Sequence, residues 1–530
     1  MKSSKSNRRE FLKLLTYSTL GVATTPMLAS CATLFSTKMK NNGFKKAIVI
    51  GSGYGGAVAA LRLTQKNIPT LLIEMGQEWK LTPKHDTFCK MITADKRSSW
   101  RSSTPHAPIT IPFFIKKYAG VLDKEKHPNM DVFLGRGLGG GSLVNGGIAI
   151  TPDKNYFEKI LPSVNSEEMF DKYFPLANKA LRVNTIEADF FEETPYYQFS
   201  RIAREDAKKA GYQTKFFPNV YDFEYMKKEA KGEVYKSALN GEVIYGNNAG
   251  KWTLDRTYIA QAQETKNLEI RTLCQVTNIE QLENGHYKIL ITKLNTKGEP
   301  IAQETYTCQY LFLGAGSMGT SKLLIKSKYE GGLSKLNEKV GQEWGSNGNI
   351  MTGRNFVNAT GRKQSTIPVL GIDGWNDPEN PIFAEIAPLP MNLETWTTLY
   401  LAITQNPERG YFAYNEITKE VQLIWNKNQN DPAKQAAKKF IDRMNKANGG
   451  TRSHLLFNNG YGDDFCYHPL GGCVLGKATD NYGRIENYKN LYAIDGSLIP
   501  GSVGVNPFVT ITALAERNMD YILKEDFLNE

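Results

Sequence analysis

The chain has 530 residues, of which 41% are hydrophobic and 22% charged, and its formal net charge is +11. This length favours two domains, and the ordinary composition excludes a disordered or fibrous protein. No basic run is long or interleaved with aromatic residues, so the charge does not indicate a nucleic-acid partner. Cys466 and Cys473 flank His468, but the second Cys–His pair of a zinc site is missing, so we expect no metal.

The first residues have the pattern of an export signal. Arg8 and Arg9 precede Phe-Leu-Lys, as in a twin-arginine signal, and a moderately apolar stretch follows. Residues 28–31, Leu-Ala-Ser-Cys, resemble the lipobox that is cleaved before a lipid-modified cysteine. We therefore expect a signal peptide over 1–30, a lipid on Cys31 that anchors the protein in a bacterial envelope, and a tether over 31–43. The alternative is an ordinary signal peptide with a chance cysteine.

A strand, a glycine turn and a helix follow the tether. The apolar segment 45–50 predicts a strand, residues 51–56 (Gly-Ser-Gly-Tyr-Gly-Gly) a tight turn and residues 57–63 a helix. A second predicted strand, 70–73, ends at Glu74, whose carboxylate can accept hydrogen bonds from an adenosine ribose. This order of elements predicts a Rossmann-type dinucleotide site.

The glycines of this region have separate expected uses. Gly51 permits the tight turn, Gly53 lets the backbone approach a pyrophosphate, and Gly56 lets helix and strand pack closely. Seven glycines within residues 135–147 disfavour a regular element and suit a backbone that lies against a large flat ligand. A flexible surface linker is the alternative for that loop.

These motifs and three near the C-terminus resemble the glucose–methanol–choline (GMC) family of flavin oxidoreductases, and within it the cholesterol oxidases that hold FAD non-covalently. The C-terminal motifs are Tyr-His-Pro-Leu-Gly-Gly-Cys at 467–473, Asp-Gly-Ser-Leu-Ile-Pro at 495–500 and Gly-Val-Asn-Pro-Phe at 504–508. The resemblance covers residues 51–79, 135–152, 369–410 and 463–523.

The resemblance implies an α/β fold of two domains: a Rossmann-type FAD-binding domain, and a substrate-binding domain built on an antiparallel or mixed sheet. A second strand–glycine–helix unit, 310–319, fits a return of the chain to the nucleotide sheet. The alternative is a second, independent nucleotide site, but no acidic residue ends a following strand as such a site requires. The expected boundaries are 44–80, 252–342 and 483–530 for the FAD-binding domain, and 81–251 and 343–482 for the substrate-binding domain.

The resemblance also implies which residues contact FAD, in addition to the glycines at positions 51, 53 and 56. The ADP half is expected to contact Tyr54, Gly55, Glu74 and Val276. The flavin and ribityl side is expected to be lined by Gly141, Asn145, Gly146 and Ile148, and closed by Asp495, Gly496 and Phe508.

Three side chains are candidates for catalysis. A histidine such as His468 suits a hydroxyl proton near neutral pH, and the amide of Asn506 can orient the oxygen without titrating. Glu385 is an acid within an apolar segment, where unpaired burial would raise its pKa. In the cholesterol oxidases the matching glutamate moves a proton from C4 to C6 of the steroid. The alternatives are a packing role for His468, a helix cap for Asn506 and an ion pair for Glu385.

The expected function is therefore oxidation of a 3β-hydroxysteroid by O2, with release of hydrogen peroxide and a shift of the Δ5 double bond to Δ4, in a monomeric enzyme. One alternative is a GMC dehydrogenase of another bulky alcohol that uses an envelope electron acceptor. A non-catalytic sterol-binding flavoprotein is the second. The irregular apolar run over 81–130, which includes Trp100, Phe113 and Phe114, is either a lid over the ligand or a packed connection.

Overall fold

The computed structural model describes residues 39–107, 113–454, 456–457 and 459–528. The predicted signal peptide, Cys31 and most of the tether lie outside these residues. The chain divides into two units, residues 1–39 and residues 40–530. All helices and strands of the described residues belong to the second unit. None of the helices in this described part is both long and apolar enough to cross a membrane.

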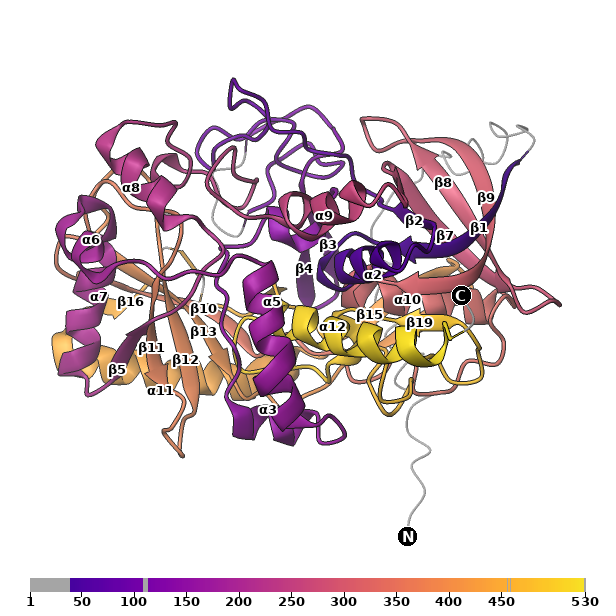
Figure 1. Ribbon diagram of the computed structural model, residues 1–530. Coiled ribbons are helices and arrows are strands. Elements are labelled where there is room, and N and C mark those ends of the chain that lie inside the picture. Colours follow the sequence, from indigo (N-terminus) through magenta and orange to yellow (C-terminus); the bar gives the residue numbers. More distant parts are fainter. Residues whose placement is uncertain (1–38, 108–112, 455, 458, 529–530) are drawn as a thin grey trace, which may run out of the picture. The chain divides into compact units, whose positions relative to one another are not determined.

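The first sheet has seven strands in the order β6-β2-β1-β9-β8-β7, with β19 also beside β9 (Figure 1). Strands β6, β2, β1, β9 and β19 run parallel, whereas β7 and β8 continue the sheet from β9 as an antiparallel meander. The predicted Rossmann-type fold is confirmed. The strands are β1 (Lys40–Ile50), β2 (Thr70–Ile73), β6 (Leu268–Arg271), β7 (Cys274–Gln281), β8 (Tyr287–Leu294), β9 (Pro300–Leu313) and β19 (Leu491–Ala493).

Strand β1 begins earlier than its apolar segment suggests. Lys40 lies opposite Glu304 and Asn41 opposite Thr305, so residues 40–43 belong to the sheet, although we expected them to end the tether. The polar sequence gave no sign of this pairing, because the partner is the long strand β9, more than 250 residues away in the chain.

Three helices pack side by side beside the first sheet: α2 (Tyr54–Gln65), α9 (Tyr258–Glu264) and α12 (Phe508–Glu525) (Figure 1). The buried carboxylate of Glu516 on α12 joins them. It accepts hydrogen bonds from the Arg62 guanidinium on α2, at 2.6 and 2.7 Å, and from the Tyr258 hydroxyl on α9, at 2.8 Å. A further helix, α10 (Gly316–Tyr329), contacts β7.

The second sheet is antiparallel and has the order β16-β10-β13-β12-β11-β5, with β17 also beside β10. Helices α7 (Gln198–Lys209) and α11 (Asp431–Asn448) pack against it. This sheet fits the predicted substrate-binding architecture. Its strands are β5 (Gln213–Phe216), β10 (Asn349–Asn355), β11 (Leu370–Gly374), β12 (Ile382–Ala387), β13 (Thr397–Thr404), β16 (Thr451–Arg452) and β17 (Tyr461–Gly462).

Two small sheets and several short helices complete the described residues. The strands are β3 (Leu122–His127), β4 (Met130–Gly135) and β18 (Phe465–Cys466) in one small sheet, and β14 (Tyr411–Asn415) and β15 (Glu420–Ile424) in the other. The helices are α3 (Lys154–Ile160), α4 (Ser166–Glu168), α5 (Phe174–Ala180), α6 (Ala188–Glu193) and α8 (Phe223–Lys231). The 3-10 or π turns are η1 (Gly140–Leu143), η2 (Met169–Tyr173), η3 (Pro195–Tyr197), η4 (Ala238–Asn240), η5 (Leu254–Arg256), η6 (Lys427–Asn430) and η7 (Gly496–Leu498).

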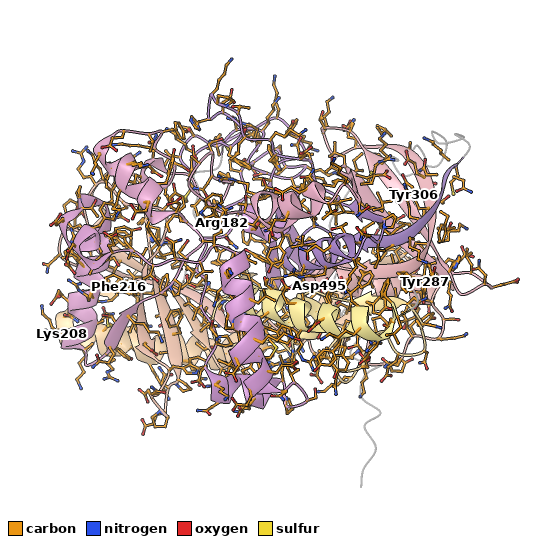
Figure 2. All side chains as sticks on the ribbon, viewed as in Figure 1. Arg182, Lys208, Phe216, Tyr287, Tyr306 and Asp495 are labelled. Carbon is orange, nitrogen blue, oxygen red and sulfur yellow. The ribbon has the colours of Figure 1, made fainter. Side chains whose placement is uncertain are left out.

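The carboxyl ends of the parallel strands meet near the second sheet. In the view of Figure 2, Asp495, just after β19, lies between Phe216 of the second sheet and Tyr287 and Tyr306 of the first. In open α/β sheets, ligands bind at the carboxyl ends of the strands. The fold therefore places any ligand of the first sheet within reach of the second.

Candidate active site

One cavity of about 860 Å³ lies at the carboxyl ends of the parallel strands and extends to the second sheet. It brings together the predicted site residues, with the exception of Gly56. Its lining includes Gly51, Gly53, Tyr54, Gly55, Glu74, Gly141, Asn145, Gly146, Ile148, Val276, Glu385, His468, Asp495, Gly496, Asn506 and Phe508.

Gly56 packs against the turn instead of facing the cavity. A Cβ on Gly56 would lie 2.0 Å from the carbonyl oxygen of Gly51, which leaves no room for a side chain. Gly51 has a φ of +92°, and a Cβ there would lie 2.4 Å from the carbonyl oxygen of Gly314. Among the predicted cofactor residues, Gly56 therefore has a packing role and no contact with the cavity.

Glu74 is held in place at the end of β2. Its carboxylate accepts hydrogen bonds from the Ser52 hydroxyl at 2.6 Å, from the Ser52 amide at 3.2 Å and from the Gly76 amide at 2.7 Å. These contacts fix an acceptor at the nucleotide end of the cavity, beside the first glycine turn. The arrangement suits a ribose hydroxyl as an additional donor.

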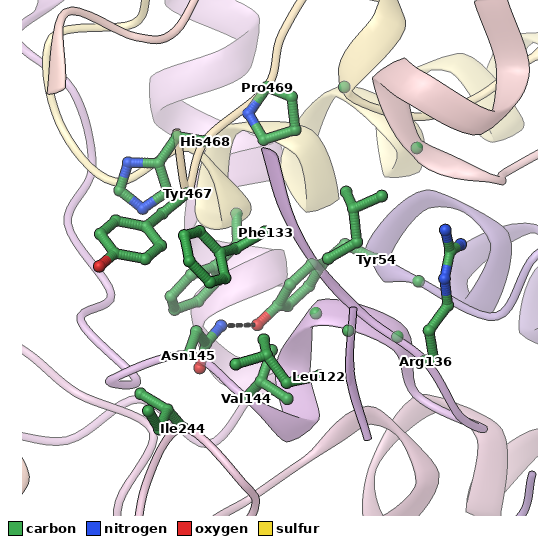
Figure 3. Close-up of a pocket in the computed structure, with 18 of the residues that line it drawn as sticks. Tyr54, Leu122, Phe133, Arg136, Val144, Asn145, Ile244, Tyr467, His468 and Pro469 are labelled. Atoms are coloured by element: carbon green, nitrogen blue, oxygen red, sulfur yellow. Dashed lines mark hydrogen bonds between the residues drawn. The ribbon is translucent and has the colours of Figure 1, made fainter. Parts of the chain in front are cut away.

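The glycine loop over 135–147 contains a short 3-10 turn, η1, where we expected no regular element. The Ser142 hydroxyl stabilises the turn by donating to the Gly139 carbonyl at 2.7 Å. Beyond η1, the Asn145 side-chain amide donates to the Tyr54 hydroxyl at 2.7 Å (Figure 3). The Tyr54 ring in turn stacks on Phe508, with 4.8 Å between the ring centroids, so the loop is tied to the start of α12.

Asp495 joins β19 to the first turn of α10. Its carboxylate accepts hydrogen bonds from the Gly316 amide at 2.8 Å and from the Thr320 hydroxyl at 2.6 Å. Burial raises the pKa of Asp495, and these hydrogen bonds oppose the shift. The residue thus connects two cavity-lining segments that are far apart in the sequence.

Glu385 faces the cavity because side chains alternate along β12. Its neighbours Ala384 and Ile386 pack in the core beneath α11, and Phe383 points to the same side of the sheet as Glu385. Burial raises the pKa of Glu385 to about 8, and a hydrogen bond with the Asn506 side chain opposes the shift. An ion pair was the alternative for this residue, but no cation among the described residues affects its pKa.

Asn506 precedes α12 without capping it. The N-cap position is Pro507, and no side chain caps the helix. Neither Oδ1 of Asn506 nor Oε1 of Glu385 has a hydrogen-bond partner within the described part of the chain, although both atoms are buried. Two buried polar atoms that lack partners in a shared cavity suit a ligand that can hydrogen bond to them.

His468 lines the same cavity, beside Tyr467 and away from Arg136 (Figure 3). Burial lowers the pKa of His468 to about 4, so its imidazole is neutral at pH 7. The following glycines let this segment approach its neighbours: a Cβ on Gly471, where φ is +81°, would lie 2.0 Å from the Glu343 carbonyl oxygen.

The apolar wall of the cavity consists mainly of residues that no sequence motif marked. The period-2 alternation of β13, in which Leu399 and Leu401 oppose Tyr400 and Ala402, was the available signal for part of it. From the run over 81–130, Phe113 lines the cavity, while Trp100 packs with Ala119 and Leu294. The apolar lining includes Met91, Ile92, Ala107, Phe113, Val243, Ile244, Met351, Leu389, Met391, Leu399 and Leu401.

Comparison with known proteins agrees with this geometry. A family model described as GMC oxidoreductase matches residues 46–345, one described as GMC oxidoreductase, C-terminal, matches residues 347–458, and a further GMC oxidoreductase model matches residues 410–515. The chain is 23% identical to a cholesterol oxidase of Acinetobacter baumannii, with 92% of this chain and 96% of the relative covered. It is 22% identical to a cholesterol oxidase of Mycobacterium tuberculosis, with 89% of each covered.

Two solved structures share the fold. One is a fungal aryl-alcohol oxidase, with a TM-score of 0.63 and 13% identity over 91% of this chain and 99% of the other. The second is pyridoxine 4-oxidase from Mesorbium loti, with a TM-score of 0.62 and 14% identity over the same shares. The chain therefore belongs to the GMC oxidoreductase family, whose members use FAD to oxidise alcohols.

Proposed function

We propose that the protein oxidises a cholesterol-like 3β-hydroxysteroid to the 3-ketone, reduces O2 to hydrogen peroxide, and then moves the Δ5 double bond to Δ4. The observation that carries the proposal is the meeting of Glu385, His468 and Asn506 in one largely apolar cavity. The likeness to two cholesterol oxidases over most of the chain supports the same substrate class.

The residues at the nucleotide end fit FAD. The backbone at Gly53 and Gly141 opens into free space, since a Cβ would have no heavy atom closer than 3.8 Å at Gly53 and none within 4 Å at Gly141. Glycine is therefore not required there by packing against the protein, which leaves close approach of a ligand as its reason. Glu74 would hold the ribose and Asn145 would lie on the flavin side. When bound, FAD supplies the two-electron oxidation.

We further propose that FAD is held without a covalent bond. Covalent attachment requires a nucleophilic side chain at the flavin ring. Of the described residues that line the cavity, the histidine is His468 and the cysteine is Cys274. Cys274 begins β7, two residues before Val276 at the adenine end, and His468 is required for the substrate hydroxyl in the proposed chemistry.

The apolar wall favours a substrate with an extended hydrocarbon body and a single hydroxyl. Met351, Leu399 and Leu401 from the second sheet and Ile244 from a loop offer surface to such a body. The polar side chains that we assign to the substrate hydroxyl are those of Glu385, His468 and Asn506. A highly polar substrate such as a sugar would leave most of its hydroxyls without partners against this wall.

The three polar residues divide the proton chemistry. Neutral His468 and the Asn506 amide orient the hydroxyl and hold its oxygen while the carbon is oxidised, and the hydroxyl proton is released to water. Glu385, with a pKa of about 8, exchanges protons readily near neutral pH. In the second step the ionised form of Glu385 takes a proton from C4 and returns one to C6, so the double bond moves and no atom is gained or lost.

We also propose that the protein is exported by the twin-arginine route and anchored through Cys31. The support is the paired Arg8 and Arg9 and the Leu-Ala-Ser-Cys sequence at 28–31. Anchoring would place the enzyme at a membrane, where sterols are dissolved.

Gly141→Ala should weaken FAD binding without unfolding the protein. The added methyl group enters open space in the apoprotein but occupies volume that FAD would fill. Fluorescence titration of the apoprotein with FAD should show at least a roughly 10-fold loss of affinity, the cost of about 1.4 kcal/mol. Gly55→Ala is the contrasting variant: its Cβ would lie 1.7 Å from the Ile494 carbonyl oxygen, so it should lower the melting temperature. Unchanged FAD affinity in Gly141→Ala would contradict the proposed fit.

Purified protein should release hydrogen peroxide when it is mixed with cholesterol under air, with no other acceptor added. Stoichiometric consumption of O2, measured with an oxygen electrode, checks the assignment of the acceptor. Turnover that appears only with an artificial acceptor would indicate a dehydrogenase. Binding of cholesterol without any turnover would indicate a sterol-binding flavoprotein.

Glu385→Gln should separate the two steps, because glutamine retains the shape but cannot carry the proton between carbons. Peroxide should still form, while the conjugated ketone, followed by its ultraviolet absorbance, should fall to a small fraction per peroxide. His468→Ala and Asn506→Ala should instead lose roughly 10²-fold in turnover, the scale expected when a reacting group is no longer held in position. The exposed Glu379 provides the control, Glu379→Gln. A wild-type yield of conjugated ketone per peroxide in Glu385→Gln would exclude the isomerase role.

Cys31→Ala should move the protein from the membrane fraction to the soluble fraction. A single acyl chain binds membranes only marginally. A lipoprotein cysteine carries more than one acyl chain and therefore anchors the protein stably. Mass spectrometry of the wild-type N-terminus should show a lipidated Cys31. An unmodified N-terminus at another residue would refute the anchor.

A further inference from the structure

Asn347 is a fully buried amide that braces the segment before Asn506. It has a φ of +59° and lies just before β10. Its Oδ1 accepts hydrogen bonds from the Val503 amide at 2.8 Å and the Ser502 hydroxyl at 3.4 Å, and its Nδ2 donates to the Val505 carbonyl at 2.8 Å. Because these partners are a backbone N–H and a backbone C=O, the side-chain oxygen and nitrogen cannot be exchanged without losing both bonds.

The same amide reaches His468. The second hydrogen of Asn347 Nδ2 is available to Nδ1 of His468, at a nitrogen–nitrogen distance of 3.4 Å. An amide nitrogen donates and does not accept, so this contact is a hydrogen bond only when Nδ1 is the unprotonated nitrogen of the imidazole. Since burial keeps this imidazole neutral at pH 7, its proton is then on Nε2.

We propose that Asn347 is a positioning residue that holds His468 as the Nε2–H tautomer and fixes the backbone that carries Asn506. Asn347 is absent from the lining of the cavity, whereas His468 and Asn506 both belong to it. Nδ1 is directed to Asn347, so Nε2 is the nitrogen left for the substrate, to which it presents a hydrogen-bond donor. The titratable residues that line the same cavity as His468 include Glu385 on β12 and Tyr467 on the same segment.

The inference concerns the site of the proposed alcohol oxidation, but its first test needs no substrate. The holoenzyme is labelled with ¹⁵N-histidine, and the His468 signals are assigned by their loss in His468→Gln; the chain has only six histidines. Between pH 6 and 8 we expect a pyridine-type nitrogen at Nδ1 and a protonated nitrogen at Nε2. A protonated Nδ1 in the wild type would overturn the proposal, even if the enzyme oxidises sterols.

Variants test whether Asn347 is the residue that holds His468 as the Nε2–H tautomer. Asn347→Ala should mix the two tautomers and lower kcat about 10-fold to 100-fold, the scale of a small displacement of a reacting group, with less change in KM. Asn347→Asp should reverse the tautomer, since a carboxylate accepts from Nδ1–H, and should raise the pKa of His468. Asn349→Ala is the matched control, because Asn349 is also buried but its side chain has no hydrogen-bond partner among the described residues.

The outcomes separate positioning from general stability. FAD content and melting temperature are measured for each variant, and a merely structural role would change them without moving the ¹⁵N pattern. A wild-type tautomer together with wild-type kcat in Asn347→Ala would overturn the proposal. If the sterol is the wrong substrate, the peroxide assay fails while the tautomer result stands, so the two failures are distinguishable.

Discussion

The structure depends on the close approach of three strand ends that leave no space for a methyl group between them. A Cβ on Gly51 would meet the Gly314 carbonyl at 2.4 Å, one on Gly314 would meet the Cα of Gly56 at 2.7 Å, and one on Gly55 would meet the Ile494 carbonyl at 1.7 Å. The ends of β1, β9 and β19 and the start of α2 are therefore in backbone contact. This contact opens the cavity on one side of the strand ends and lets Asp495 reach the first turn of α10.

The second sheet turns this nucleotide site into a site for chemistry. Its strand β12 offers Ala384 and Ile386 to the helices and Glu385 to the cavity, because alternate side chains face opposite sides of a sheet. The same apolar surroundings then act oppositely on two groups. Desolvation disfavours the charged form of each, so it raises the pKa of Glu385 to about 8 and lowers that of His468 to about 4. Burial alone is thus sufficient to give a protonated carboxyl and a neutral imidazole at neutral pH.

A network of amides connects these groups. The Asn506 side chain limits the rise in the pKa of Glu385, and Asn347 contacts both His468 and the segment that carries Asn506. Amides suit this position because they orient neighbours through fixed donors and acceptors and do not titrate. Asn145 performs the same kind of task at Tyr54.

Local pattern alone determined the parts of this protein whose signal lies within a few residues. The strands at 45–50 and 70–73 and the glycine turn after the first of them depend on side-chain periodicity and on backbone freedom, which neighbouring residues reveal. The motifs that contain His468 and Asn506 were visible for the same reason, and the segment around Glu385 was marked by an acid among apolar residues.

Only the tertiary structure decided which distant segments share the cavity. Residues 40–43 joined the sheet because β9 offered partners, and the apolar wall drew on loops that carry no motif. Asn347 has no recognisable sequence context, and its importance comes from Val503, Val505 and His468, all more than 100 residues away. Sequence periodicity indicates on which side of a strand or helix a side chain lies. It does not indicate what packs against that side, because the packing partners come from distant parts of the chain.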